Sequence, residues 1–398
     1  MAKLFIEDLE LRGKKVITRV DFNVPLEGGK VDNDKRLRAS LPTIKYLMDQ
    51  GAKIILMSHL GRPKGQVVEE MRMAPVAEAL GALLGREVKN TTDCVGEEVK
   101  TVVGSLGEGE ILLLENLRFH KAETENDPGF AQDLASLADI YINDAFGTAH
   151  RAHASTEGIT RFFSQCACGY LIKKEIEFLG EALNDPQKPF VAIIGGAKIS
   201  GKIDVMEALL AKVDTLLIGG GMAYTFSKAQ GLEIGKSLFE PDKLELAGKL
   251  LERSGGKIRL PVDSVVTDEL DVKGRTVGSL ETVPQDQIPA GAYAVDIGPQ
   301  TIEQFSGVIE QAKTLVWNGP MGVFEIGETA KGTYEIANAL VRATAQGAAS
   351  IIGGGDSASA IEKGGLADKV THVSTGGGAS LEFLEGKKLP GIEALTEK

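Results

Sequence analysis

The chain has 398 residues, of which 43% are hydrophobic and 25% charged, and its formal net charge at pH 7 is -12. Because a single hydrophobic core stops growing at roughly 250–300 residues, this length predicts two domains. The negative charge argues against a nucleic-acid surface, and no apolar run approaches the roughly 20 residues that cross a bilayer, so neither nucleic acid nor a membrane is an expected partner.

The N-terminal region and the cysteines indicate a cytoplasmic protein with reduced thiols. Charges interrupt the apolar residues of the first 15 positions, unlike a secretory signal peptide. Cys94, Cys166 and Cys168 are too few for a disulfide framework, and Cys166-Ala167-Cys168 lacks the spacing of a redox or zinc motif. We expect the cysteines to be buried as small apolar side chains. His59, His150 and His153 lack a carboxylate or cysteine at ligand spacing, so zinc is not expected there.

Short runs rich in leucine and β-branched residues alternate with helical patterns through the first half of the chain. The predicted strands are residues 16–17, 52–57, 111–114 and 140–142, and the predicted helices include 41–48 and 74–84. Runs that are apolar throughout are typical of parallel strands buried on both faces. The alternation therefore predicts an α/β domain with a parallel sheet.

The segment from Gly169 to Phe190 separates the two halves and has the pattern of an amphipathic helix. Its apolar residues recur at helical spacing, with charged residues between them: Ile172, Ile176, Leu179 and Leu183. Asn184-Asp185-Pro186 then ends the helix. We interpret this segment as the joint between two domains.

The second half repeats the α/β pattern, and we expect its strands to form one sizeable sheet. The seven predicted strands are 190–194, 215–218, 257–260, 293–295, 314–317, 350–352 and 370–373. In both halves the distinctive polar residues follow the last apolar residue of a strand. Ligands bind to open parallel sheets at that edge, so these residues predict a cleft.

Arginines follow the predicted strands of the first half repeatedly. Arg19, Asp21 and Asn23 alternate with apolar residues after the first strand, although an edge strand with one solvated face would give the same pattern. Arg36 lies in a charged loop, and further arginines occur in Ser58–Pro63, Glu115–Arg118 and Asp144–Arg151. An isolated arginine usually makes a surface salt bridge of little energetic value. Repetition at strand ends instead predicts an anion site, because guanidinium groups match carboxylate and phosphate in bidentate geometry.

A strand, a glycine turn and a helix that begins with two lysines are predicted over residues 190–202. The free amides and the dipole of a helix N-terminus bind phosphate, and Lys198 and Lys202, four residues apart, would share one helical face. The segment is not a P-loop, because Ile203 stands where Ser or Thr would hold magnesium. It also lacks the glycine fingerprint of dinucleotide-binding proteins.

Glycine clusters follow three other predicted strands, in Gly219–Gly221, Gly353–Gly355 and Gly376–Gly378. A glycine cluster alone is usually a turn, but four after parallel strands suggest a surface shaped for phosphates and a flat base. Asp356, directly after the second of these clusters, is the best candidate for a magnesium ligand. The alternative is that Asp356 is simply the N-cap of the next helix.

Several motifs together resemble the phosphoglycerate kinase family, in order and along the whole chain. They are Arg19–Pro25, Ser58–Pro63, Leu112–Phe119, Asp144–Ser155, Gly195–Lys198, Trp317–Glu325, Gly353–Asp356 and Ser374–Leu381. The departures from the family pattern are small: Ala294 stands where relatives often have glycine, and Gly201 lies between the matched lysines. Neither removes a required side chain.

The resemblance implies two Rossmann-like three-layer (αβα) lobes with parallel sheets, joined by an interdomain hinge helix at about 170–185. Residues 1–169 would form the phosphoglycerate-binding domain, with a C-terminal tail at about 389–398 returning to it. Residues 170–388 would form the nucleotide-binding domain. The implied reaction is reversible phosphoryl transfer from 1,3-bisphosphoglycerate to MgADP, which gives 3-phosphoglycerate and MgATP, in a monomer whose lobes close before transfer.

The resemblance also implies a role for individual residues. The substrate-binding residues would be Asp21, Asn23, Arg36, His59, Arg62, Arg118 and Arg151. The nucleotide-binding residues would be Gly196, Ala197, Lys198, Lys202, Gly219, Gly220, Ala294, Val295, Asn318, Pro320, Glu325, Gly353, Gly354, Gly355, Asp356 and Ser357. Arg36, Lys198, Gly355 and Gly378 would act in catalysis, and Asp356 would bind Mg²⁺.

Two other functions fit part of the sequence. A non-catalytic nucleotide-binding or scaffold protein could keep the glycine clusters, but it would not need the arginines and both lysines. An NAD-dependent dehydrogenase would share the α/β pattern, but the chain lacks the fingerprint and the acidic residue that binds ribose.

Overall fold

The computed structural model describes residues 3–398, except for the side chain of Glu181. The chain divides into two compact units: unit 1 runs to Glu177 and includes Lys388–Lys398, and unit 2 is Phe178–Lys387. The boundary lies inside helix α6 (Tyr170–Asn184), which occupies the segment expected to be the joint. The ligand that each unit binds stays a prediction.

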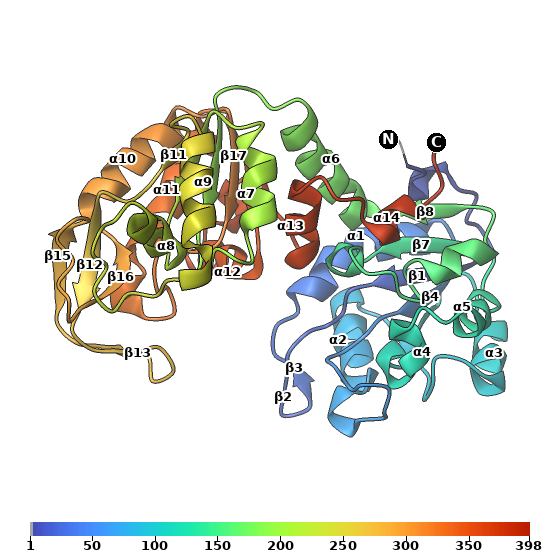
Figure 1. Ribbon diagram of the computed structural model, residues 1–398. Helices are drawn as coiled ribbons and strands as arrows, with labels where there is room; N and C mark the ends of the chain where they lie inside the picture. The colour runs from blue at the N-terminus through green and yellow to red at the C-terminus, as the bar shows by residue number, and fades with distance from the viewer. Residues whose placement is uncertain (1–2) are drawn as a thin grey trace. The chain divides into compact units, whose positions relative to one another are not determined.

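Both units alternate strands and helices along the chain (Figure 1). In unit 1 the elements are β1 (Lys15–Val20), β2 (Leu26–Glu27), β3 (Lys30–Val31), α1 (Lys35–Asp49), β4 (Lys53–Met57), α2 (Ala74–Leu84), β5 (Lys89–Asn90), α3 (Glu97–Gly104), β6 (Ile111–Leu113), α4 (Lys121–Thr124), α5 (Pro128–Ala135), β7 (Ile140–Asp144), β8 (Cys166–Cys168) and α14 (Pro390–Glu393). In unit 2, after α6, they are β9 (Phe190–Ile194), α7 (Ile203–Leu210), β10 (Thr215–Ile218), α8 (Met222–Ala229), α9 (Leu244–Arg253), β11 (Ile258–Arg259), β12 (Asp263–Thr267), β13 (Leu270–Asp271), β14 (Thr276–Val277), β15 (Leu280–Pro284), β16 (Tyr293–Ile297), α10 (Pro299–Glu310), β17 (Thr314–Asn318), α11 (Lys331–Ala345), β18 (Ala349–Gly353), α12 (Gly355–Lys363), β19 (His372–Val373) and α13 (Gly378–Leu384).

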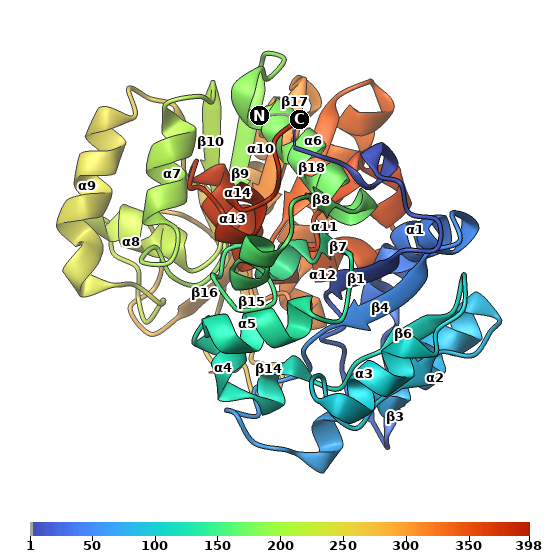
Figure 2. The same cartoon turned by 90° about the vertical axis from the view of Figure 1, so that its right-hand side faces the viewer.

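The sheet of unit 1 is parallel and has the strand order β5-β6-β4-β1-β7-β8. Val16 and Ile54 pack against α1 and α2, and the alternate residues Ile17 and Ile55 are also buried. Both faces are therefore covered, which explains why the strands are apolar throughout. Figure 2 shows this sheet from another side, with α2 and α3 beside it.

Strand β1 lies in the middle of the sheet, between β4 and β7. Arg19, near its end, is completely buried. Arg19, Asp21 and Asn23 therefore do not alternate with apolar residues because β1 is an edge strand, and that alternative is wrong. The charged side chain of Arg19 inside the sheet needs another explanation.

The last residues of the chain belong to unit 1. The backbone N–H of Gly391 donates to the carbonyl of Ala149 at 2.8 Å, and Asn143 donates its side-chain amide to the carbonyl of Gly391 at 2.9 Å. Residues 388–398 thus contact the segment that follows β7.

Unit 2 has a parallel sheet with the order β11-β10-β9-β17-β18-β19. Val191, Leu315 and Trp317 face α10 and α11, whose apolar residues complete the core. The prediction that residues 293–295 belong to the same sheet was wrong, because β16 pairs antiparallel with β12 in a separate sheet, β15-β12-β16. A short apolar run gives no information on the direction of its partner strand.

Two local predictions were also wrong. Arg36 is the second residue of helix α1 instead of a loop residue. Lys198 and Lys202 both precede helix α7, which begins at Ile203, so they do not share a helical face. The helix predicted at 74–84 is confirmed as α2.

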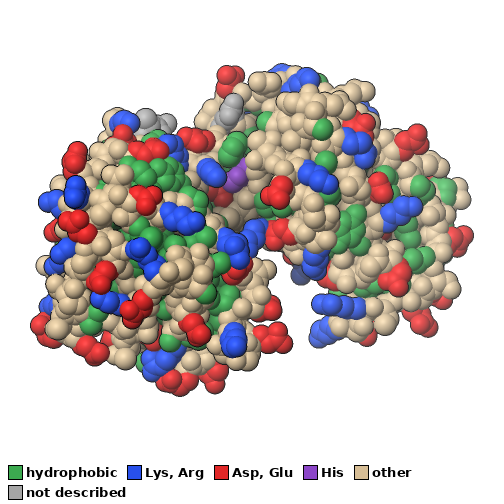
Figure 3. All heavy atoms as spheres, turned by 180° about the vertical axis from the view of Figure 1, so that it is seen from behind, with side chains coloured by type: hydrophobic (Ala, Val, Ile, Leu, Met, Phe, Trp, Pro, Cys, Tyr) green, Lys and Arg blue, Asp and Glu red, His purple; other side chains and the backbone are tan. Residues whose placement is uncertain are grey.

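On the face drawn in Figure 3, Lys and Arg side chains are interspersed with Asp and Glu side chains. Among residues 3–398, no helix has the length and apolar character needed to cross a membrane. The absence of a nucleic-acid partner stays a prediction.

Candidate active site

The anion-binding residues predicted in unit 1 lie where four parallel strands end. Asp21 and Asn23 follow β1, and His59 and Arg62 follow β4. Arg118 lies in a short 3-10 helix (Leu117–Phe119) after β6, Arg151 follows β7, and Arg36 lies in the first turn of α1. Because these strands are parallel neighbours, the loops after them meet at one edge of the sheet.

Contacts join several of these residues, some directly and some through Gly61. The N–H of Asn23 donates to Asp21 Oδ1 at 3.3 Å. Arg36 Nη1 lies 2.7 Å from Asp21 Oδ1. The N–H of Gly61 donates to Asn23 Oδ1 at 2.8 Å, and Arg118 Nη1 donates to the carbonyl of Gly61 at 2.9 Å. We call Asp21, Asn23, Arg36, His59 and Arg118 the anion cluster.

Arg118 carries a buried charge that nearby carboxylates offset only in part. Its side chain is 8% exposed, and its Nε has no hydrogen-bond partner. Burial, together with the positive charges of Arg19 and Arg151, lowers the pKa of Arg118 to about 10, against the opposing effects of Glu123 and Asp21. An anion bound at Nε would offset this unfavourable charge.

The remaining predicted residues of unit 1 differ in exposure. His59 is 3% exposed, and burial, together with Arg19 and Arg118, holds its pKa well below the usual range. Arg62 and Arg151 are exposed. Within residues 3–398 no hydrogen bond ties Arg62 to the anion cluster.

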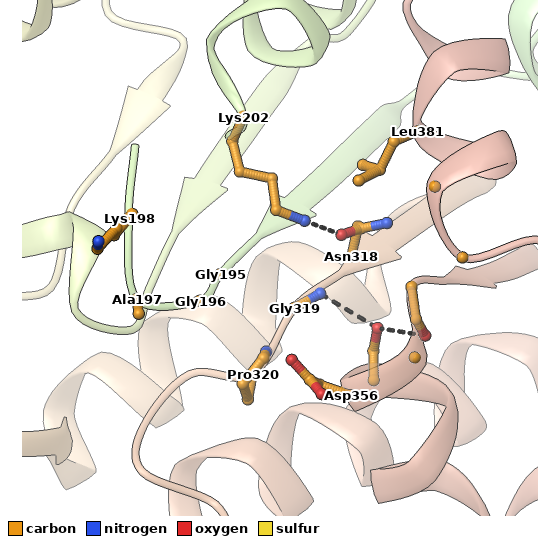
Figure 4. A pocket seen from close by; sticks show the side chains of 15 residues that line it. Gly195, Gly196, Ala197, Lys198, Lys202, Asn318, Gly319, Pro320, Asp356 and Leu381 are labelled. Atoms are coloured by element: carbon orange, nitrogen blue, oxygen red, sulfur yellow. Dashed lines mark hydrogen bonds between the residues drawn. The ribbon is translucent and has the colours of Figure 1, made fainter. Parts of the chain in front are cut away.

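In unit 2, a cavity of about 350 Å³ lies at the carboxyl ends of β9, β17 and β18 (Figure 4). The predicted residues that line it are Gly196, Ala197, Lys198, Lys202, Asn318, Pro320, Gly354, Gly355, Asp356, Ser357 and Gly378. Backbone amides and two lysines in one cavity give the surroundings that phosphate groups require. We call it the phosphate cavity.

The two lysines of the phosphate cavity differ in their surroundings. Lys198 is exposed and points away from Lys202 in Figure 4. Lys202 donates to Oδ1 of Asn318. Burial lowers the pKa of Lys202 to about 8, against the opposing effects of Asp356 and Glu385. Lys198 is thus a solvent-exposed cation, whereas Lys202 is held in place by its bond to Asn318.

Asp356 is suited to binding a divalent cation beside phosphates. It is the second residue of α12, and the N-cap of that helix is Gly354, so the alternative of an N-cap aspartate is wrong. The Asp356 side chain is exposed and lines the phosphate cavity and a second, adjacent cavity. Magnesium is usually held by one or two carboxylates together with substrate phosphates, and Asp356 fits that role.

The second cavity has a volume of about 430 Å³ and adjoins the phosphate cavity at Gly196, Ala197, Pro320 and Asp356. Of the predicted nucleotide-binding residues, Gly220, Ala294, Val295 and Glu325 also line it. Sequence reasoning missed several apolar and aromatic lining residues: Tyr224, Leu238, Leu270, Val272 and Tyr293. Mainly apolar walls with a few polar groups are typical of a site for a planar base.

Gly219 and Gly353 line neither cavity. A Cβ at Gly219 would lie 2.5 Å from Met321 Sδ, and one at Gly353 would lie 3.1 Å from Asn318 Nδ2. Both glycines therefore permit close packing behind the cavities. At Gly354 the backbone φ of +81° requires glycine, and the turn it makes begins α12.

Among the residues that the structure describes, one group has the geometry to hold a metal ion: Asp93, Cys94 and His120. The histidines considered from the sequence are not part of it. His120 Nε2 already lies 2.7 Å from Asp93 Oδ1, and all three cysteines are free and buried. Burial raises the pKa of the Cys94 thiol well above its usual value, in agreement with the expected role of the cysteines as small buried side chains.

Comparisons with known proteins identify the family of the chain. A family model for phosphoglycerate kinase matches residues 6–387. The chain is 58% identical to phosphoglycerate kinase from Moorella thermoacetica and 57% identical to that from Chlorobaculum tepidum, over the full length of each pair. The phosphoglycerate kinase structure from Coxiella burnetii is 42% identical with a TM-score of 0.88, and that from Pyrococcus horikoshii OT3 is 34% identical with a TM-score of 0.85. Each alignment covers 98% of both chains. The chain therefore belongs to the phosphoglycerate kinase family.

Proposed function

We propose that this chain transfers a phosphoryl group reversibly between 1,3-bisphosphoglycerate and MgADP, with 3-phosphoglycerate and MgATP as the products. The observation that carries the proposal is that each unit holds one half of the required chemistry. Unit 1 offers a basic anion cluster, and unit 2 offers a phosphate cavity beside an apolar cavity.

The anion cluster suits a small substrate with a carboxylate and a phosphate. The unpartnered Nε of Arg118 and the guanidinium of Arg36 supply donors in the planar geometry that such groups favour. Arg62 and Arg151 are exposed in the segments that follow β4 and β7, on either side of β1, and would complete the contacts with the ligand. A local excess of positive charge is needed because the chain as a whole is acidic.

The nucleotide would extend across both cavities of unit 2. Its base and ribose would lie between Ala294, Val295 and Glu325, and its phosphates beside Gly196, Lys202 and the first turn of α12. Asp356 would hold Mg²⁺, which neutralises phosphate charge when bound.

The proposed transfer needs no general base. A carboxylate nucleophile has a pKa near about 4 and is already ionised at neutral pH. Catalysis then depends on alignment and on stabilising the charge of the transferring group. Arg36 from unit 1 and Lys198 from unit 2 would do this, aided by the backbone N–H groups of Gly355 and Gly378, the first residues of α12 and α13.

We further propose that the units close around the ligands before transfer, that the protein is monomeric, and that it acts in cytoplasmic carbohydrate metabolism. In-line transfer requires the reacting oxygen and phosphorus to approach within about 3.5 Å with water excluded. Substrates held on separate units must therefore be brought together. Helix α6, which spans the boundary of the units, is our candidate for the hinge.

A coupled assay tests the proposed activity. Purified protein is mixed with ATP, Mg²⁺ and 3-phosphoglycerate, and the acyl phosphate formed is consumed by a dehydrogenase that oxidises NADH. We expect NADH loss only when all three reactants are present. Nucleotide binding without turnover would instead support a non-catalytic protein, and NAD reduction without ATP would support a dehydrogenase.

A further inference from the structure

Arg19 and His59 form a buried pair at the anion cluster of unit 1. Arg19 is completely buried, and His59 is 3% exposed. Arg19 Nη2 lies 3.0 Å from Nδ1 of His59. Burying a guanidinium inside a parallel sheet costs free energy unless its N–H groups donate hydrogen bonds. The partners that accept these bonds therefore indicate what Arg19 does.

The other donors of Arg19 fix the orientation of the guanidinium. Nε donates to Ser155 Oγ at 2.8 Å, and Nη1 donates to the carbonyl of Val20. Ser155 is itself held by Glu123: its hydroxyl donates to Oε1 at 2.6 Å and its N–H donates to Oε2 at 3.0 Å. The Nη2 group therefore points at His59 because its neighbours leave it no other orientation.

This contact determines which nitrogen of His59 carries the proton. A guanidinium can only donate hydrogen bonds, so Nδ1 of His59 must accept. In a neutral imidazole the proton then lies on Nε2. Burial and the nearby charges of Arg19 and Arg118 lower the pKa of His59 well below its usual value, so the ring is neutral at pH 7. Within residues 3–398 no side chain or backbone group bonds to Nε2.

We propose that Arg19 is a positioning residue that fixes His59 as the Nε2–H tautomer, so that His59 donates a hydrogen bond to an anionic oxygen of the glycerate substrate. The identity of the acceptor rests on the proposed function. The opposite tautomer would turn a lone pair toward the anion and repel it. Arg19 thus acts through His59 and need not touch the substrate.

Nuclear magnetic resonance of the histidine rings tests the tautomer directly in the free protein. The chain has five histidines, and His59→Gln identifies the signals of His59 in two-bond ¹H–¹⁵N spectra. We expect the Nε2–H pattern from pH 6 to 8 and a shift of the Nε2 proton when 3-phosphoglycerate is added. A proton on Nδ1, or a charged ring at pH 7, would overturn the proposal.

Variants of Arg19 test whether this residue fixes the tautomer of His59. Arg19→Met removes the donor, and we expect mixed tautomers of His59 and about 10-fold to 100-fold weaker binding of 3-phosphoglycerate. Arg19→Lys keeps a donor and should keep the tautomer. Ser155→Ala removes one of the contacts that orient the guanidinium and should act in the same direction as Arg19→Met, but more weakly. Arg12→Met makes the same substitution at an exposed arginine of unit 1 and is the matched control. MgADP binding to unit 2 should be unchanged in each variant, and an unchanged urea unfolding transition verifies that unit 1 is folded.

The results of these experiments distinguish a failure of the proposed role of Arg19 from a failure of the proposed function. If Arg19→Met kept the Nε2–H tautomer and the affinity of the unmodified protein, the role of Arg19 would be refuted. If Arg19→Met does not fold, the tautomer of the unmodified protein still decides the assignment. If His59 were the Nε2–H tautomer but 3-phosphoglycerate did not bind, the proposed substrate would be wrong.

Discussion

Arg36 Nη1 lies 2.7 Å from Asp21 Oδ1, and the Arg36 side chain is still 37% exposed. The carboxylate thus holds the guanidinium at the carboxyl edge of the sheet while leaving donors available to a ligand. A pair with this exposure adds little to stability. Its importance is in orienting Arg36 toward a bound ligand.

We expect Arg36→Ala and Lys198→Ala each to lower kcat by about 10²-fold to 10³-fold, the range found when one donor to a transition-state charge is removed. The KM values should change much less, since these contacts matter most in the transition state. Steady-state kinetics in both directions measures this. The control for Arg36 is Arg38→Ala, because Arg38 lies on the same helix and pairs with Asp34 at 2.7 Å. A rise in KM alone would show that the assigned roles are wrong.

The affinity for MgADP should fall as the pH rises above about 8. Lys202 has a pKa lowered to about 8 by burial, so it is charged below that pH and neutral above it. Its attraction for phosphate is therefore present at pH 7 and lost at pH 9. Calorimetric titrations between pH 7 and 9 measure the effect. Lys202→Met should bind MgADP weakly, with an affinity that depends little on pH. If the affinity of this variant fell with pH as steeply as that of the unmodified protein, the pH dependence would come from another group.

Asp356→Asn should weaken MgADP binding with little effect on 3-phosphoglycerate. The substitution removes the charge of a proposed magnesium ligand in unit 2 and leaves unit 1 intact. Calorimetry of each ligand alone gives the two affinities. Omitting Mg²⁺ should weaken ADP binding to the unmodified protein more than to the variant. Equal losses for both ligands would contradict separate half-sites.

Asp144 should make the stability of the protein depend on pH. It is completely buried, and its Oδ1 accepts the N–H of Leu171 at 2.9 Å at the start of α6. Burial raises the pKa of Asp144 from 3.8 to about 7. The folded state therefore binds this proton more tightly than the unfolded state, so the contribution to stability is present below about pH 4 and is lost as the pH rises through 7.

Urea unfolding at pH 5.5 and pH 8 measures how the contribution of Asp144 to stability changes with pH. We expect a lower free energy of unfolding at pH 8, and a smaller difference between the two pH values for Asp144→Asn. If the two proteins showed the same difference, the pH dependence would come from other groups.

Closure of the units should make the protein more compact when both ligands are bound. Solution X-ray scattering can compare the radius of gyration without ligand, with 3-phosphoglycerate, with MgADP and with both. The smallest value is expected with both ligands, because only then does transfer chemistry require closure. If the radius of gyration were the same in all four states, the proposal that α6 is a hinge would be wrong.

Much of the fold could be predicted because apolar periodicity reports burial directly. The helix at 74–84 and the strands at 190–194 and 314–317 follow their patterns closely. The short strands β5 and β19 were not predicted with their observed bounds, since two residues carry no measurable period. The α1 helix begins six residues earlier than predicted, at Lys35, and it contains Pro42, which sequence rules place near a helix start.

The candidate site was predictable only in part, for a different physical reason. Asp356 directly follows a glycine cluster after β18, and Lys202 directly precedes α7 in a segment that begins with a glycine turn, so both could be found from local patterns. Leu270 and Val272 reach the second cavity from the β13–β14 hairpin, and no local pattern encodes that long-range position. Arg19 was visible in the sequence, but its burial and its contact with His59 depend on the neighbouring strand.

The most direct measurement of the central claim is ³¹P nuclear magnetic resonance of the purified protein with ATP, Mg²⁺ and 3-phosphoglycerate. The account predicts loss of the ATP γ-phosphate signal and the appearance of ADP and of an acyl phosphate. The change should reverse when ADP is added in excess. No exchange of the γ-phosphate, in a preparation that binds both ligands, would contradict the account.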